Sequence, residues 1–160
     1  MAGLALLITL LAAVASPLPG DATIVDFELA GSVHRADEIL GIWRAAGVID
    51  DAKASQLFDL VYPLIYAAAL AAGCVAAAGA WSKAGKPRLA AAGIAMAWVA
   101  TAAAAFDYVE NLGLAVSLWG EPASPWPQLS LVAGLLKFVA IALSLLFALT
   151  TACVVAARRS

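Results

Sequence analysis

The sequence predicts an all-α, polytopic membrane protein: a bundle of four transmembrane helices with a short amphipathic helix in its first extracytoplasmic loop. Composition is the first indication, since the 160-residue chain is 64% hydrophobic and only 12% charged. Its apolar runs exceed about 18 residues, which a soluble core of this size has no room to bury. Charge is a further indication, because basic residues gather at two short places and acidic residues fill one long stretch.

Four apolar segments are expected to cross the bilayer within a single membrane domain, residues 1–160. The first segment is short, because a bilayer core takes about 20 residues, and Ala13-Val14-Ala15 resembles a signal-peptidase site. Residues 1–15 are therefore either part of a retained helix or a cleaved signal. The expected spans cover about residues 2–18, 57–81, 89–118 and 129–157.

The long polar stretch, about residues 19–55, is expected to contain one amphipathic helix from Val33 to Ala46, with Ser32 as N-cap and Gly47 after its last turn. Its apolar residues recur with helical spacing at Ala36, Ile39, Leu40 and Trp43. This helix either rests on the bundle or lies at the membrane interface with Trp43 as its anchor. A lid over a cavity is the alternative.

Two features are expected to shape the start of the second span. Asp50 and Asp51 can open a helix, because carboxylates favour the positive N-terminal end of the helix dipole. Pro63 has no main-chain N–H, so it is expected to kink the span or to free the carbonyl of Asp59.

Charge also predicts the topology. The stretch before the second span holds seven acidic and three basic residues, whereas the turn after that span and the C-terminal tail are basic. Loops rich in Lys and Arg stay in the cytoplasm. Both termini are therefore expected to be cytoplasmic, in a multi-pass protein of the cell membrane. The basic residues are Lys83, Lys86 and Arg88 in the turn, and Arg158 and Arg159 in the tail.

The third span carries a polar stripe near its outer end. Asp107, Glu110 and Asn111 follow at helical i, i+3, i+4 spacing, so they share one face. A carboxylate at the bilayer centre costs at least about 2.5–3.5 kcal/mol, so this face must meet other helices, a wet cavity or a ligand. Counted at 1.5 Å per residue, the two acids and Lys137 of the fourth span lie roughly 12–16 Å below the outer edge. We therefore expect one shared polar cluster in the outer half of the bilayer.

Three interpretations of this cluster remain open. It is a structural network, a site for a small cationic or lipidic ligand, or an intramembrane enzyme site in which Asp107 and Glu110 act as an acid–base pair on a lipidic substrate. The sequence does not decide whether the protein is an enzyme. The candidate ligand-binding residues are Asp59, Tyr62, Tyr66, Asp107, Glu110, Asn111 and Lys137.

Other chemistry is not indicated. A single histidine, His34, offers no zinc-ligand cluster, and we expect neither a metal nor a cofactor. Cys74 and Cys153 lie in apolar runs and are expected to be packed small residues. A net charge of −2 argues against nucleic acid as a partner. The expected partner is membrane lipid, and oligomerisation is left open.

The combination of Asp59-x-x-Tyr62-Pro63-x-x-Tyr66, Asp107-x-x-Glu110-Asn111 and Lys137 resembles a group of uncharacterised four-helix bacterial integral membrane proteins. Their pattern is D-x-x-[FY]-P-x-x-Y, then D-x-x-E-N, then a Lys in the last helix. The resemblance implies a four-helix protein of a bacterial inner membrane and brings no assigned activity. The chain departs from the group at Asp51-Ala52-Lys53, where the group carries Gly-Arg and a Tyr.

Overall fold

The computed structural model describes residues 18–19 and 22–158, and all regular secondary structure in these ranges is helical. Three helical segments are long and apolar enough to cross a membrane: Ile49–Lys83, Pro87–Trp119 and Trp126–Ala157. Length and composition therefore indicate a membrane protein. The predicted first span, residues 2–18, lies outside the described residues apart from Leu18. The alternative of a cleaved signal over residues 1–15 concerns the same part of the chain.

The structure divides into two compact units. The first unit consists of the described part of Met1–Tyr62 together with Asp107–Leu135. The second unit consists of Pro63–Phe106 together with the described part of Leu136–Ser160.

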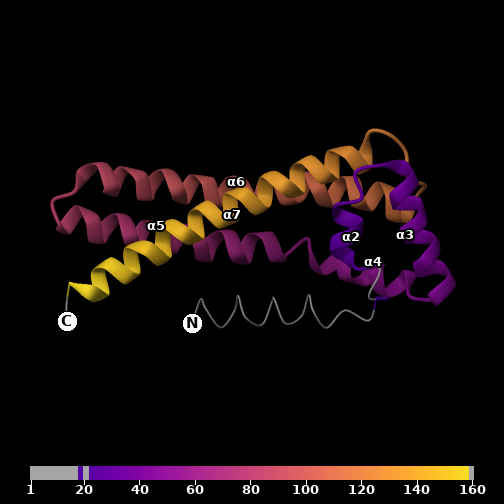
Figure 1. Cartoon of the computed structure of the whole chain (residues 1–160), viewed down its shortest axis with the longest axis horizontal. Helices are drawn as coiled ribbons and strands as arrows, with labels where there is room; N and C mark the ends of the chain where they lie inside the picture. Colours follow the sequence, from indigo (N-terminus) through magenta and orange to yellow (C-terminus); the bar gives the residue numbers. More distant parts are fainter. Residues whose placement is uncertain (1–17, 20–21, 159–160) are drawn as a thin grey trace. The chain divides into compact units, whose positions relative to one another are not determined.

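The first unit is built from α2 (Ile24–Glu28), α3 (Val33–Ala46) and α4 (Ile49–Phe58), with residues 107–119 of α6 (Pro87–Trp119) and 126–135 of α7 (Trp126–Ala157) (Figure 1). Its core joins apolar side chains of the N-terminal segment to the end of α6. The fully or nearly fully buried members are Leu18, Ala22, Phe27, Ala36, Ile39, Leu40, Trp43, Ala52, Leu114 and Leu118.

Trp43 lies in the middle of this core. Its side chain has no exposed surface, its indole N–H donates to the carbonyl of Ala22 at 2.6 Å, and its ring centroid is 5.1 Å from that of Phe27. An interfacial anchor must reach the lipid headgroups, so the version of the prediction in which Trp43 anchors α3 at the membrane interface is wrong. The helix rests on protein instead.

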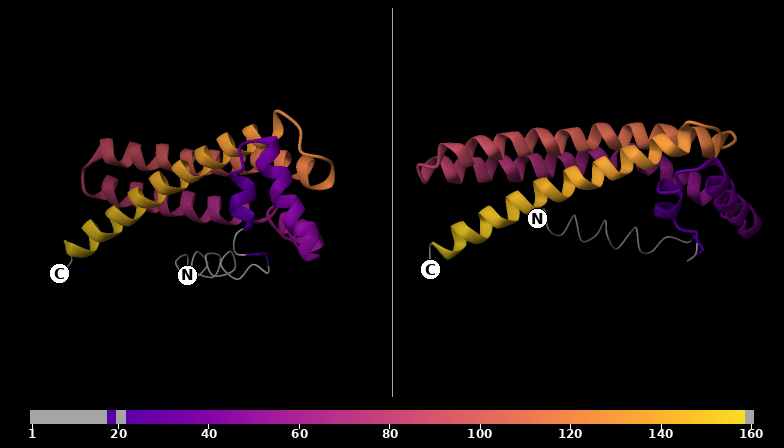
Figure 2. Two further views of the ribbon diagram at one scale, coloured as in Figure 1. Left: turned by 45° about the vertical axis from the view of Figure 1, so that its right-hand side comes forward. Right: turned by 45° about the horizontal axis from the view of Figure 1, so that its top comes forward.

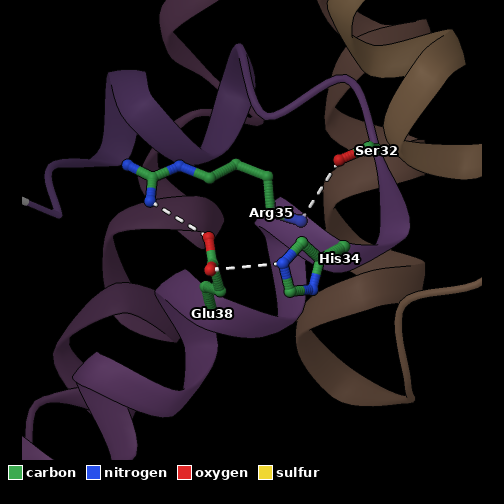
Figure 3. Close-up of polar contacts among 4 residues, drawn as sticks. All are labelled: Ser32, His34, Arg35 and Glu38. Atoms are coloured by element: carbon green, nitrogen blue, oxygen red, sulfur yellow. Dashed lines mark hydrogen bonds and ion pairs between the residues drawn. The ribbon is translucent and has the colours of Figure 1, made fainter.

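The ends of α3 follow its local sequence. The hydroxyl of Ser32 accepts a hydrogen bond from the N–H of Arg35 at 3.2 Å, and Gly47 ends the helix with a left-handed φ of 72°. The outer face carries an exposed ion-pair group in which Glu38 contacts both His34 and Arg35 (Figure 3). Such exposed pairs contribute little to stability. The side chain of His34 is 87% exposed, so His34 is a solvated residue of this helix.

The apolar segment Ile49–Lys83 is interrupted near its start. Asp50 and Asp51 lie in the first turn of α4, which ends at Phe58, and three residues separate it from α5 (Tyr62–Lys83). Pro63 predicts such an interruption because it cannot donate to the carbonyl four residues before it. The expected start of the span at about residue 57 is thus the end of α4, while the expected third and fourth spans agree with α6 and α7 to within a few residues.

In the second unit, the helices pack against one another through small residues. Figures 1 and 2 show α5 running beside the first part of α6, the two being joined by a turn in which Gly85 has a φ of 68°. A Cβ on Gly93 of α6 would lie 2.8 Å from the Cβ of Ala78 of α5 and 3.0 Å from its main chain. The two helices approach this closely because Gly93 has no side chain and that of Ala78 is a single methyl group.

Residues of α7 join α5 and α6 in this unit through short polar side chains. Ser144 donates to the carbonyl of Met96 at 3.2 Å and accepts the thiol of Cys74 on its own carbonyl at 3.4 Å. The indole of Trp81 donates to the hydroxyl of Thr151 at 3.0 Å. Cys74 is therefore packed as expected, whereas Cys153 is exposed, and that part of the prediction is wrong.

Candidate functional site

The polar stripe of α6 meets the broken helix in the first unit. The side-chain amide of Asn111 donates to the carbonyl of Asp59 at 3.1 Å, and the hydroxyl of Tyr108 donates to the carbonyl of Leu60 at 2.8 Å. The carbonyl of Asp59 is the one that Pro63 leaves without a helical donor. Two side chains of α6 therefore supply donors where the helix is interrupted.

A chain of amides continues from this point. The Nδ2 of Asn111 also donates to Oδ1 of Asp107 at 3.2 Å, and the Oδ1 of Asn111 accepts from Nε2 of Gln56 at 2.7 Å. Gln56 lies on α4 and is only 2% exposed. Its own carbonyl oxygen, Oε1, is buried and has no hydrogen-bond partner among the described residues. Gln56, Asp107, Glu110 and Asn111 are named the amide–carboxylate cluster below.

Glu110 completes the cluster against α7. Its side chain has no exposed surface, and a Cβ on Gly134 would lie 2.9 Å from Oε1 of Glu110. Only a residue without a side chain leaves this space for the carboxylate. On the same face, Ser130 donates to the main-chain carbonyl of Glu110 at 3.2 Å, and a Cβ on Gly113 would collide with the hydroxyl of Ser130. Two glycines and a serine thus let α6 and α7 approach closely in the first unit.

The structure brings together only some of the residues that the sequence predicts for the site. Asp107, Glu110 and Asn111 are all buried in the first unit, and Asp59 joins them through its main-chain carbonyl. Tyr62 is half-buried at the start of α5. Tyr66 and Lys137 are buried and belong to the second unit, so the pairing of Lys137 with Asp107 or Glu110 remains a prediction.

Sequence reasoning missed Gln56, Tyr108, Ser130 and Gly134. Gln56 had a usable signal, because it lies three residues before Asp59 and so extends the polar stripe of that helix by one turn. Ser130 and Gly134 are four residues apart and share one face of α7, a spacing typical of close helix contacts. Tyr108 gave a weaker signal, because it directly follows Asp107 and therefore lies about 100° around the helix from it.

The chemistry of the cluster is that of a hydrogen-bond acceptor. It contains the amide oxygen of Gln56 and the carboxyl groups of Asp107 and Glu110, all of which accept hydrogen bonds when the acids are ionised. In the described part of the chain, no group of three or more His, Cys, Asp and Glu side chains is arranged to hold a metal ion. Comparison of the chain with protein-family models, with curated proteins and with solved structures gave no match.

Proposed function

We propose that this chain is a four-helix protein of the cell membrane, with both termini in the cytoplasm, that binds a small cationic or hydroxylated ligand at the amide–carboxylate cluster. Membrane lipid is the nearest source of such a ligand. The cluster then lies in the outer half of the bilayer, below the segment that contains α2 and α3.

The observation that carries the proposal is the burial of two carboxyl groups one turn apart on α6. Asp107 is 5% exposed and Glu110 is fully buried, in a helix with the length and composition of a membrane span. Away from their ends, the three long apolar segments contain three acids, Asp59, Asp107 and Glu110, and one basic residue, Lys137. If all four groups are ionised, the acids outnumber the base, and a proton or a cationic group balances the difference.

The distribution of charge supports the proposed topology, and exposed apolar side chains support the location in a membrane. The turn between α5 and α6 is basic and the segment before α4 is acidic, which supports a cytoplasmic turn. Many large apolar side chains of the three long helices are exposed, as lipid contact requires. They include Leu64, Ile65, Val75, Ile94, Trp98, Leu112, Leu136, Leu143 and Leu146.

A purely structural role is the second candidate, and the hydrogen bonds of Asn111 and Tyr108 to the broken helix favour it. The two roles are compatible, because a network that fixes the helix break also fixes the carboxyl groups beside it. Acid–base catalysis by Asp107 and Glu110 stays a prediction from the sequence.

Ligand binding can be tested with the full chain purified into lipid nanodiscs of mixed composition. Asp107→Asn combined with Glu110→Gln keeps the side-chain shapes and removes both carboxylates. We expect native mass spectrometry to detect about tenfold less co-purified ligand or lipid on the double variant than on the unaltered protein. The reason is that a charge-assisted hydrogen bond contributes roughly 1.5–3 kcal/mol to binding.

Glu121→Gln is the matched control, since Glu121 is an exposed acid in the loop between α6 and α7. It should bind as the unaltered protein does. A folded double variant with an unchanged set of bound molecules would contradict a binding function and leave the structural role.

A further inference from the structure

We propose that the second unit binds the headgroup phosphate of an anionic phospholipid at the end where the turn between α5 and α6 lies. Four exposed basic side chains of this unit, named the basic patch below, hold the phosphate: Lys83, Lys86, Arg88 and Arg158. The amide–carboxylate cluster belongs to the first unit, so this inference does not rest on the proposed function.

Trp81 brings the basic patch together. The guanidinium group of Arg158 lies over its ring, 5.4 Å from the ring centroid, while its indole N–H donates to Thr151 of α7. The main-chain N–H of Lys86, in the turn, donates to the carbonyl of Trp81 at 2.9 Å. Figures 1 and 2 show the end of α7 and this turn at the same end of the unit. Basic residues from the turn and from the end of α7 are therefore held close to one indole.

No acidic side chain of the second unit balances this charge, because the unit contains neither Asp nor Glu. In the part of the chain that the structure describes, none of the four basic side chains forms an ion pair. Lys86 and Arg88 also flank the first residue of α6, where the helix dipole is positive and a basic side chain is unfavourable. The preference of basic loops for the cytoplasm accounts for the sign of these charges but not for their gathering at Trp81. An anion from outside the chain satisfies them.

Apolar side chains next to the basic patch indicate that this anion is a lipid. The main-chain N–H of Arg158 donates to the carbonyl of Val154 at 3.3 Å, so Val154 lies one helical turn before it. Val154 is 37% exposed, and Leu89, which directly follows Arg88, is 39% exposed. A phosphate on the patch thus has exposed apolar surface beside it for acyl chains.

The chemistry of the patch favours an anionic headgroup. Arg binds phosphate through a fork of N–H groups, and Lys binds it as a point charge. The phosphate of a zwitterionic headgroup already has an ammonium group beside it, whereas that of phosphatidylglycerol has none. Clusters of Lys and Arg next to membrane helices are known to attract anionic lipids.

Lipid retention by the full chain tests the inference. The protein is placed in nanodiscs of equal parts phosphatidylglycerol and phosphatidylcholine, transferred to detergent, and its retained lipids are counted by native mass spectrometry. We expect phosphatidylglycerol to be enriched at least about tenfold, because each basic residue near an anionic surface favours binding by about fivefold. Equal retention of the two lipids would overturn the inference.

Arg158→Gln should lower the enrichment by about fivefold, because it removes one charge from the patch. Arg44→Gln is the matched control, since Arg44 is an exposed arginine of the first unit that pairs with Asp37, and it should keep the enrichment. An Arg158→Gln variant that retains lipid as the Arg44→Gln variant does would contradict the assignment.

Trp81→Leu separates the placement of the charges from their number. It keeps all four basic side chains and removes the ring under Arg158, so a lower enrichment is expected. An unchanged enrichment would show diffuse attraction and no site. If Trp81→Leu does not fold, the comparison of Arg158→Gln with Arg44→Gln still decides the question.

Competition distinguishes a lipid from a soluble anion. Inorganic phosphate at millimolar concentration should leave phosphatidylglycerol bound, because it has no acyl chains to contact Leu89 and Val154. Displacement of the lipid at that concentration would assign a soluble phosphate and overturn the choice of a lipid.

Discussion

The two units of the molecule hold their helices together in different ways. In the first unit, large side chains interlock, as Trp43 does with Phe27, Leu114 and Leu118 in one core. In the second unit, helices approach through glycine and alanine, as at Gly93 and Ala78. The first pattern is typical of a core formed from water, where burying apolar area is the driving force. The second is typical of lipid, where apolar area gives no advantage and close approach does.

The polar contacts of the two units also differ in the length of the side chains that make them. The first unit uses long side chains to reach main-chain groups across an interruption, as Asn111 and Tyr108 do. The second unit uses a hydroxyl that lies directly between two helices, as Ser144 does with Met96. Substitutions that remove volume should therefore harm the Trp43 core of the first unit most. Substitutions that add volume should harm the glycine contacts most, at Gly93 in the second unit and at Gly113 and Gly134 of the first unit.

The largest effect is expected from Trp43→Ala. Removing a fully buried indole that also donates a hydrogen bond to Ala22 should cost about 3–5 kcal/mol of unfolding free energy. Chemical unfolding in detergent, followed by the fluorescence of the remaining tryptophans, measures it. Trp98→Ala removes an indole that is 71% exposed and should change stability little. Equal losses in the two variants would show that the first unit has no core of the kind described.

A smaller effect is expected from adding one methyl group to the second unit. Gly93→Ala places a Cβ against the main chain of Ala78 and should destabilise by about 1–3 kcal/mol, because neither helix can shift without disturbing its neighbours. Gly79→Ala meets no atom within 4 Å and should be neutral or stabilising by up to about 1 kcal/mol. Thermal unfolding in one detergent compares them. If Gly93→Ala is as stable as Gly79→Ala, close helix approach is not what holds this unit.

The smallest effect concerns the N-terminus of α2. The Thr23 hydroxyl, which donates to Asp26 at 2.5 Å, and the Thr23 main-chain N–H hold the pKa of Asp26 below its ordinary value of 3.8. A lowered pKa in the folded state stabilises the protein above pH 3.8, and this contribution is lost as the pH falls through the folded-state pKa.

Thr23→Val should therefore cost less than about 1 kcal/mol near neutral pH, and this difference should shrink in acid. Unfolding curves over a range of acidic pH measure the change. Thr101→Val is the control, because its exposed hydroxyl bonds only to a carbonyl of its own helix, and it should show no such pH dependence. A pH-independent cost of Thr23→Val would argue against the hydrogen bond from the Thr23 hydroxyl to the Asp26 carboxylate.

Local signals explain what the sequence could predict. Ser32 and Gly47 mark the ends of α3 because capping depends on a few neighbouring residues, and Pro63 marks the helix break for the same reason. The burial of Asp107, Glu110 and Asn111 followed from their shared face in an apolar helix. Each of these features is decided within one or two turns of chain.

What the sequence missed depends on residues far apart in the chain. Gln56 acquires its role only because Asn111, 55 positions later, presents an oxygen to it. Trp43 turns inward because Leu114 and Leu118 complete its core, whereas its helical spacing alone fits an interfacial position equally well. The depth of Lys137 can be counted from sequence, but helix rotation cannot, so its pairing stays a prediction.

The helix break between α4 and α5 also constrains the order in which the protein matures. The donors for the carbonyls of Asp59 and Leu60 come from Asn111 and Tyr108, which leave the ribosome some 50 residues later. A carbonyl without a donor costs several kcal/mol in hydrocarbon. Even an unbroken helix would leave the carbonyl of Asp59 without a donor, because Pro63 has no N–H. We therefore expect the break to stay in water until α6 has been inserted.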